Sequence, residues 1–407
     1  MGRVWWLLLT LGLSLIFLLL FAVLEQRPLE VEALRYFPAE LLERGRTFAR
    51  EVRIAASLQA LASLGLLLFL CFSPPGARLL ARLEGVEGTG WRSLLRVVLG
   101  LFLLTSLVEL PFSFYLGHLH EKAYGLTRQA AGDWLVEHLV NLGVSLALQL
   151  LLWLPCYWLI RRSPRRWWLP ATALTAGFSA VMVALYPVLI LPLEHPVRPV
   201  RDPQVLAMIQ RLADQAGVEV EAVAELQVSP KSNRLNAMVT GLGPTKQVIL
   251  YNTLRQQMTP AEVEVVLAHE LSHAAHGDLV RSWLLSATTG AVGLALAAWL
   301  LRAMQEVGPL YLPAPHAARG LALLLLFFSL FDSITAPIHN YQSRQMEVRA
   351  DAFALRLTQN PRAMVTSFQK LAGANPSDPS PPAVVEFLSH SHPSILRRIR
   401  RAMEGTR

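Results

Sequence analysis

The residues best suited to carry chemistry lie in the segment 268–278, which reads A-H-E-L-S-H-A-A-H-G-D. His269 and His273 are four positions apart, so on an α-helix both imidazoles project from one face and can bind one metal ion. Glu270 lies between them and can handle the proton of a water at the open coordination position. This H-E-x-x-H pattern predicts a zinc hydrolase, and a chance occurrence on a polar helix surface is the alternative.

The helix that would carry this motif has its own start signals. Thr259 is a candidate N-cap, Pro260 suits the first helical position, and Glu262 completes a T-x-x-E capping box. The motif follows an apolar run at 263–267, so much of the helix should be buried. Because buried imidazoles and carboxylates are costly unless they are paired or coordinated, this context favours a metal site over chance.

Composition places the chain in a membrane. Of its 407 residues, 53% are hydrophobic and only 16% are charged, against about 25% charged in a soluble domain. The two cysteines, Cys71 and Cys156, lie inside apolar runs and indicate no disulfide framework. The net charge of +8 comes from basic residues that flank apolar segments, as membrane anchors do, so nucleic-acid binding is not expected.

Seven apolar segments are long enough to span a bilayer as helices. They are residues 5–24, 54–73, 94–116, 140–160, 169–193, 282–301 and 321–338. The first is not expected to be a signal peptide, because no small-residue cleavage site follows it and more spans do. Glu109, Gln149 and Asp332 lie inside these spans, where polar groups either bond between helices or line a wet cavity.

The spans divide the chain into four predicted parts. Residues 1–194 hold five spans with their connections, including a charged helical segment at 28–53, and residues 282–340 hold the last two. Residues 195–281 are soluble in composition and form the catalytic domain, with a helix at 202–215, strands at 223–228, 235–240 and 247–251, and then the motif helix. Residues 341–407 complete that domain and include a helix at 347–357.

Two histidines do not complete a catalytic zinc site, which takes three protein ligands. The longer pattern H-E-x-x-H-x-x-G-x-x-H fails, since its glycine position is His276 and its last ligand position is Leu279. Glu347 is the best candidate: it follows the last span, whereas the motif helix precedes the sixth, so both lie on the same membrane face. An exposed helix carboxylate is the alternative. Asp351, one turn later, could orient a ligating histidine.

Further motifs in this order give a specific family resemblance. From about residue 110 to 398 the chain resembles the integral-membrane CAAX prenyl endopeptidases (type I CAAX proteases), which are seven-span zinc enzymes. The matching stretches are Leu110-Pro111-Phe112-Ser113-Phe114-Tyr115, Glu121, Tyr124-Gly125-Leu126, Leu185-Tyr186-Pro187, Pro192-Leu193, Asn236-Ala237, Gly241, 248–254, the E-x-x-x-D of Glu347 and Asp351, and the H-P-x-x-x-x-R of His392, Pro393 and Arg398.

This resemblance implies a mainly α membrane protein: about seven transmembrane helices form a chamber, capped by a small α+β zinc metallopeptidase domain. One Zn²⁺ would be held by His269, His273 and Glu347, with Glu270 as general base. The resemblance also implies active-site roles in substrate binding and transition-state stabilisation, for Asn236, His392 and Arg398. Their local alternatives are a turn cap, a loop start and a solvated basic helix end. His276 and Asp278 are expected to be structural or to support the ligands.

The expected partners are membrane lipids and a peptide or protein substrate, which can be lipidated or membrane-embedded. Residues 235–240, as an exposed edge strand, could align that substrate by strand addition. A broad quality-control protease is an alternative, although such proteases have fewer spans. A transporter or channel with a structural metal site is another, but it would have no need of Glu270.

The distribution of arginines gives conflicting predictions of which side of the membrane the catalytic domain faces. Arginines between spans two and three and after span four would place those loops in the cytosol, with the catalytic face opposite. The segment 27–53 carries six arginines on the catalytic side, and the family resemblance implies a cytosolic domain. The cytosolic orientation is the expectation.

Overall fold

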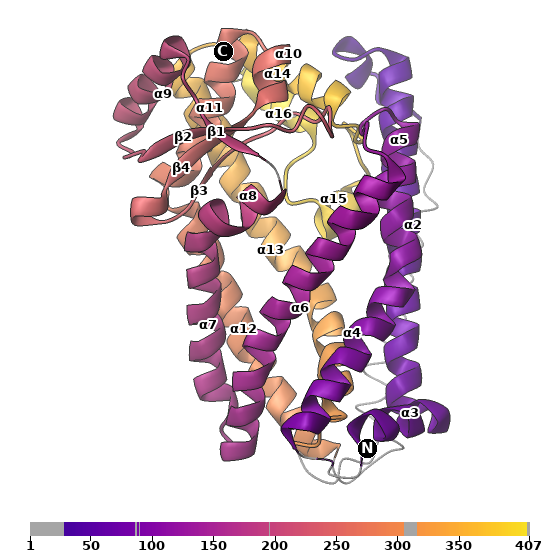
Figure 1. Cartoon of the computed structure of the whole chain (residues 1–407). Coiled ribbons are helices and arrows are strands. Elements are labelled where there is room, and N and C mark those ends of the chain that lie inside the picture. Colours follow the sequence, from indigo (N-terminus) through magenta and orange to yellow (C-terminus); the bar gives the residue numbers. More distant parts are fainter. Residues whose placement is uncertain (1–27, 86–87, 89, 195, 305–315, 405–407) are drawn as a thin grey trace.

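Membrane-spanning helices and a mixed helix–sheet domain make up the protein (Figure 1). The computed structural model describes residues 28–404 except 86–87, 89, 195 and 305–315. Within these residues, six helical segments are long and apolar enough to cross a membrane: Ala39–Phe72 (α2), Trp91–Ala123 (α4 to α5), Ala131–Arg162 (α6), Trp168–Leu193 (α7 to α8), Asp278–Ala303 (α12) and Gly320–Thr358 (α13). Six of the seven predicted spans are thereby confirmed, and the first, 5–24, lies outside the described residues.

The spans are splayed rather than tightly packed. Only 6% of the most apolar window of α6 is buried inside the protein, 11% in the span that contains α7, and 33% in α12. A close-packed bundle would bury far more of each helix surface, so most of these side chains face lipid or the space between helices. At the end away from the catalytic domain the helices do pack, around buried residues such as Leu70, Leu101 and Trp167.

Two helices run through boundaries that the sequence suggested. α2 joins the charged segment to the second predicted span, and α13 joins the last span to the predicted helix at 347–357. α13 continues for 39 residues although Pro337 lies inside it. A proline removes one helical hydrogen bond, a loss that helices in a membrane protein tolerate when neighbouring groups compensate. α13 is therefore one continuous helix that runs from the bilayer into the catalytic domain.

The helices α4 and α7 change geometry where they reach the catalytic domain. α4 (Trp91–Phe114) passes into a π-helical segment, Tyr115–His120, and then into α5 (Glu121–Ala123). α7 (Trp168–Leu185) does the same through Tyr186–Ile190 into α8 (Leu191–Glu194). On the opposite side of the membrane, α3 (Pro74–Glu84) connects α2 to α4.

The catalytic domain contains a four-stranded sheet in the order β1-β2-β4-β3. Its strands are Val197–Pro199, Ala222–Leu226, Ala237–Thr240 and Gln247–Tyr251, numbered β1 to β4 along the chain. β2 and β4 are parallel and the other pairs are antiparallel. The three predicted strands are confirmed, and β1 is an addition. β3 begins at Ala237, two residues later than predicted, and it forms an edge of the sheet.

Five of the described helices form the core of the domain with this sheet: α9 (Pro203–Ala216), α10 (Asn252–Gln257), α11 (Pro260–Ala275), α14 (Pro361–Ala374) and α16 (Ile395–Glu404). α15 (Ala383–Ser389) packs against α13. Buried residues of α11, α13, α14 and α16, such as Leu267, Ala354, Phe368 and Ile399, pack in one cluster with Leu250 of β4. The start of α2 joins this core through Leu42. The domain is therefore built from both ends of the described chain.

Candidate metal centre

The motif helix α11 begins as predicted. The backbone N–H of Thr259 donates to Glu262 Oε2 at 2.7 Å, and Thr259 Oγ1 accepts from the N–H of Glu262 at 3.4 Å. Lys370 of α14 donates to the same Glu262 oxygen at 2.6 Å. This capping box holds the helix start against α14. The helix ends at Ala275, and Gly277, with a φ of +64°, then turns the chain directly into α12.

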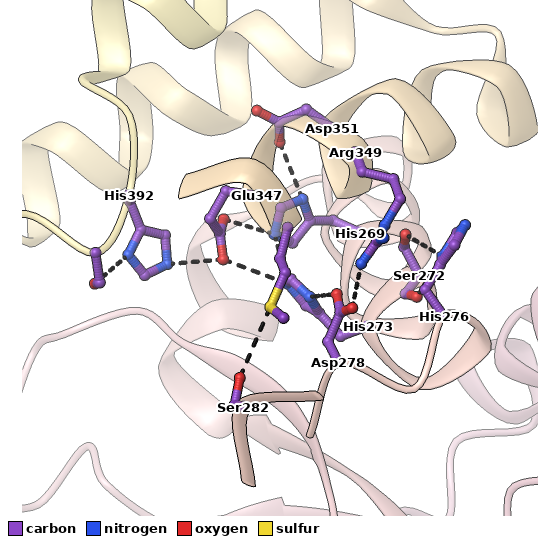
Figure 2. Close-up of polar contacts among 12 residues, drawn as sticks. His269, Ser272, His273, His276, Asp278, Ser282, Glu347, Arg349, Asp351 and His392 are labelled. Carbon is purple, nitrogen blue, oxygen red and sulfur yellow. Dashed lines mark hydrogen bonds and ion pairs between the residues drawn. The ribbon is translucent and has the colours of Figure 1, made fainter. Parts of the chain in front are cut away.

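Three side chains from α11 and α13 converge on one point (Figure 2). His269 Nε2 lies 3.3 Å from His273 Nε2, and the two oxygens of Glu347 lie 3.2 Å from His269 Nε2 and 3.4 Å from His273 Nε2. One ligand atom from each residue lies within 4.8 Å of the other two. Two imidazoles and one carboxylate in this arrangement match the donor set of catalytic zinc sites, which leave a fourth position for water.

The outward nitrogen of each histidine faces a carboxylate. His269 Nδ1 lies 3.0 Å from Asp351 Oδ1, and His273 Nδ1 lies 2.9 Å from Asp278 Oδ2 (Figure 2). Such contacts fix the tautomer, so that Nε2 of each ring carries the lone pair toward the centre. Asp351 stands where the sequence predicted an orienting carboxylate.

Two arginines hold these carboxylates in turn. Arg398 of α16 donates to both oxygens of Asp351, at 2.6 Å and 2.8 Å, and Arg349 of α13 donates to Asp278. The guanidinium of Arg398 also lies over the ring of Phe368, 4.5 Å from its centroid. Arg398 also lines the cavity, but because Nε and Nη2 both bond Asp351, these contacts favour support of the ligand shell over direct contact with a substrate.

Electrostatics at the centre favour a cation. Burial disfavours the protonated imidazoles, yet hydrogen bonds to Asp351 and Glu347 outweigh it and raise the pKa of His269 to about 9. Asp278 and Glu347 do the same for His273, whose pKa rises to about 10. Glu347 Oε2 is buried, with His269 Nε2 at 3.2 Å and Arg398 Nη2 at 3.6 Å. Buried carboxylate charge of this kind is what a divalent metal ion would neutralise.

Glu270 lies beside the ligands and lines a cavity of about 520 Å³. Burial raises the pKa of this carboxyl, although the nearby charges of His269 and His273 oppose the shift. A carboxylate with a raised pKa, at the cavity side of the centre, is suited to exchange a proton with a water there. The cavity therefore places a candidate base between the ligands and the space that a substrate would fill.

The short connection between α15 and α16 brings His392 to the same centre. Its Nε2 lies 3.2 Å from Glu347 Oε1, and its side chain is 56% exposed, against 12% for Arg398. Ser391 Oγ lies 2.8 Å from its Nδ1. His392 lines the cavity, so an N–H on its ring can reach a bound molecule. The structure thus brings together His269, Glu270, His273, Glu347, Asp351, His392 and Arg398.

Asn236 lies apart from the ligands but lines the same cavity. Its Oδ1 accepts a hydrogen bond from the N–H of Ala237 at 3.0 Å, while its carbonyl accepts one from Tyr251 of β4 at 3.0 Å. Because bonded pairs alternate along an antiparallel ladder, the peptide groups of Ala237 and Val239 point away from β4. An open strand edge therefore borders the cavity.

Asn375 occupies the next position along this edge. Its side-chain amide donates to the carbonyl of Leu235 at 2.8 Å and its Oδ1 accepts from the N–H of Leu235 at 3.1 Å. The side chain thus pairs with Leu235 as a neighbouring strand would. Asn375 lies 140 positions from Leu235 and in no motif, so the sequence offered no signal for this contact.

Asp278 and His276 were expected to be structural or supporting. Asp278 contacts His273, as described, whereas His276 Nδ1 lies 2.8 Å from the carbonyl oxygen of Ser272 in its own helix. The ring of His276 packs edge-on against Phe353. Arg349 belongs to no motif in the sequence, and only the fold reveals its contact with Asp278.

Comparison with known proteins agrees with this geometry. Residues 199–406 match the profile of peptidase family M48, and residues 37–194 match one described as the CAAX prenyl protease N-terminal part with five membrane helices. The uncharacterized metalloprotease YhfN of Bacillus subtilis is 32% identical over 309 residues, which cover 74% of this chain and 71% of that protein.

Two further relatives extend the comparison to most of the chain. A CAAX prenyl protease 1 homolog of Dictyostelium discoideum is 25% identical over 300 residues, 72% of this chain and 68% of its own. The crystal structure of S. mikatae Ste24p superposes with a TM-score of 0.79 at 22% identity, covering 95% of this chain and 94% of that one. At that identity, the structural match concerns the fold.

Proposed function

Since the chain belongs to peptidase family M48, we propose that it is a zinc-dependent integral-membrane endopeptidase of the CAAX prenyl protease type. The observation that carries this proposal is the convergence of His269 Nε2, His273 Nε2 and the Glu347 carboxylate. Family membership makes the chain a metalloendopeptidase with peptide or protein substrates, and its six described spans make it a multi-pass membrane protein. These facts also disfavour a transporter with a structural metal.

His269, His273 and Glu347 would hold the metal. Bound there, Zn²⁺ would lower the pKa of a water toward about 7 and polarise the scissile carbonyl. Glu270 would take the proton of the attacking water and later pass it to the leaving amine. Its raised pKa supports both steps, because an acid–base group works best when its pKa lies near the operating pH. Asp351 and Asp278 would keep the two imidazoles in the tautomer that presents Nε2.

His392 would stabilise the developing oxyanion. It is the exposed donor closest to Glu347, at 3.2 Å, and one such donor is worth about 2.7–4 kcal/mol in other hydrolases. Arg398 would act mainly through Asp351, with its positive charge 3.6 Å from Glu347 Oε2. Both side chains line the cavity, but His392 is 56% exposed, whereas Arg398 is 12% exposed and bonded to Asp351, which favours His392 as the donor to a substrate.

The substrate would lie along the β3 edge. The outward peptide groups of Ala237 and Val239 can pair with an extended peptide, and Asn236 would turn its amide from Ala237 toward the substrate. Backbone pairing of this kind does not depend on side chains, so it does not by itself select a sequence. The match to CAAX prenyl proteases supports prenylated peptides as the substrate class, with general membrane-protein turnover as the alternative.

The test uses the purified full chain in detergent, assayed for bound zinc and for cleavage of one peptide with and without a farnesyl group. Glu270→Gln should keep the zinc and reduce cleavage by about 10²–10⁴-fold. Glu264→Gln is the matched control, since Glu264 lies on the same helix and pairs with Arg211 outside the cavity. Full activity of Glu270→Gln would refute the mechanism. Equal cleavage of both peptides would refute prenyl recognition and favour general turnover.

We further propose that the catalytic domain faces the cytosol. Arg44, Arg46, Arg50 and Arg53 lie at its end of α2, whereas the opposite end has Arg78 and Arg82 on α3 and two arginines at the end of α6, so charge alone does not decide. The native cysteines are buried. A membrane-impermeant maleimide on intact cells should therefore label Arg82→Cys and spare Glu219→Cys, and the reverse pattern would invert the orientation.

A further inference from the structure

Four polar residues form a stripe on one face of α13. Asn340, Arg344, Glu347 and Asp351 are spaced by four, three and four positions, so they project from the same side of the helix. Glu347 and Asp351 belong to the metal centre. Asn340 and Arg344 are not explained by metal binding, and their contacts lead to a different part of the site.

Arg344 is buried and its described hydrogen bonds go to main-chain oxygens. Its side chain is only 9% exposed, and Nη1 donates to the carbonyl of Glu386 at 3.0 Å and to that of His390 at 2.6 Å. Asn340 donates to the carbonyl of Leu388, between them, at 2.9 Å. These carbonyls belong to the last turn of α15 and the residue after it, where helix carbonyls lack partners and a cation is favourable.

The anchored carbonyls lie just ahead of His392. Five residues, 390–394, connect α15 to α16, and His392 is the third of them. Arg344 binds the carbonyl of the first residue of the connection, His390. Just after its last residue, Arg398 of α16 is bound to Asp351. The same face of α13 therefore fixes both ends of the connection and carries the carboxylate, Glu347, that His392 approaches.

The side chain of His392 has little support of its own. It is 56% exposed, and its contacts are the neighbouring Ser391 hydroxyl and Glu347. The position of the His392 ring must therefore be set by the backbone of the connection 390–394. Within the described residues, Arg344 hydrogen-bonds to carbonyl groups rather than to a carboxylate, so the burial of its charge is costly.

We propose that Arg344 is a positioning residue that holds the backbone of the His392 connection at the distance from Glu347 that catalysis needs. This inference rests on the proposed function, in which His392 stabilises the transition state. A shift of about 1 Å in such a group can cost about 10²-fold in rate. The loss should appear in kcat with little change in KM, since His392 would act on the transition state and not on the bound peptide.

The experiment compares Arg344→Gln, Arg344→Lys and the control Arg356→Gln. Arg356 is exposed in the last turn of the same helix, and its guanidinium lies 5.9 Å from the ring centroid of Phe353. We expect Arg344→Gln to keep the zinc and to lower kcat by about ten- to a hundredfold. Arg344→Lys, which keeps one charged donor, should restore part of this loss, and Arg356→Gln should match the unmodified enzyme.

The double variant Arg344→Gln/His392→Ala separates positioning from general destabilisation. If Arg344 acts through His392, the double variant should be no slower than His392→Ala alone. Multiplying losses, or an Arg344→Gln enzyme within twofold of the unmodified one, would overturn the inference. A fully active His392→Ala would instead overturn the role proposed for His392. Should Arg344→Gln fail to fold, Asn340→Ala provides the same comparison, with a smaller expected loss in kcat.

Discussion

Nδ1 of His273 lies 2.9 Å from Oδ2 of Asp278, a residue five positions later that begins the next membrane helix. Gly277 makes this contact possible, because its left-handed backbone turns α11 into α12 without a loop. His273, a proposed metal ligand, and the carboxylate of Asp278 that contacts it thus stand on two helices joined through Gly277. A change in the angle between α11 and α12 would therefore move His273 relative to Asp278.

This relationship predicts that Asp278→Asn weakens metal binding without abolishing it. Loss of an outer carboxylate typically lowers metal affinity by about 10–100-fold. Titration of the metal-free protein with zinc should show this decrease, and excess zinc should restore most of the activity. Asp214→Asn, at an exposed carboxylate on α9, should leave zinc affinity unchanged. Equal affinities in both variants would remove Asp278 from the centre.

Glu347→Ala should lose the metal altogether. The two histidines that remain offer too few donors for a stable catalytic zinc site, so zinc content measured after dialysis should fall to background. Glu386→Ala is a suitable comparison, because Glu386 is also a buried carboxylate of the C-terminal region but pairs with Arg397. Unchanged zinc content in Glu347→Ala would refute its role as a ligand.

Asn375→Ala should raise KM for extended peptides. The substitution removes two hydrogen bonds to Leu235, each worth about 0.5–1.5 kcal/mol, so the strand edge beside Asn236 becomes less ordered. We expect a KM several-fold higher with kcat nearly unchanged. Asn375→Asp keeps the acceptor for the Leu235 N–H but loses the donor. Its KM should lie between those of the unmodified enzyme and Asn375→Ala. A drop in kcat at constant KM would contradict this account.

The ion pair between Glu121 and Arg234 should couple the membrane helices to the β3 edge. Arg234 Nη2 lies 2.5 Å from Glu121 Oε1, and the partners are 35% and 18% exposed. Arg234 stands two residues ahead of Asn236, so Glu121→Gln should lower the melting temperature in detergent and raise KM. The Arg211–Glu264 pair has the same distance but an arginine 54% exposed, and Glu264→Gln should have a smaller effect. Equal effects of the two substitutions would argue against coupling.

The stability of the catalytic domain should fall with pH below about 6.5. Burial, with the charges of Arg53, Arg344 and His392, lowers the pKa of His390 from 6.5 to about 4. Between these two values the unfolded chain binds a proton that the folded protein does not, so acidification favours unfolding, by at most about 3 kcal/mol. Melting temperatures measured from pH 8 to 4 should show this decline, and His390→Gln should flatten it. An unchanged slope in that variant would assign the decline to other groups.

Short-range patterns in the sequence determined many of the helices of this protein. The H-E-x-x-H spacing, the Thr259 capping box and the apolar lengths of six spans each depend on residues within a few turns of one another, and the structure places them as predicted. Hydrophobic length sets a membrane helix, and a cap sets its own helix start, without reference to distant parts of the chain. The E-x-x-x-D motif of the family resemblance likewise pointed to Glu347 and Asp351, and the fold brings both carboxylates beside His269.

Only the tertiary structure decided which side chains meet. Asn375 pairs with Leu235, Arg398 with Asp351, and Arg344 with the carbonyl of His390, contacts that join residues 46 to 140 positions apart. Periodicity reports which face of a helix is polar, but it does not report which polar partner that face will meet. Here the continuous helix α13 determines those partners, because its stripe from Asn340 to Asp351 faces both α11 and the His392 connection.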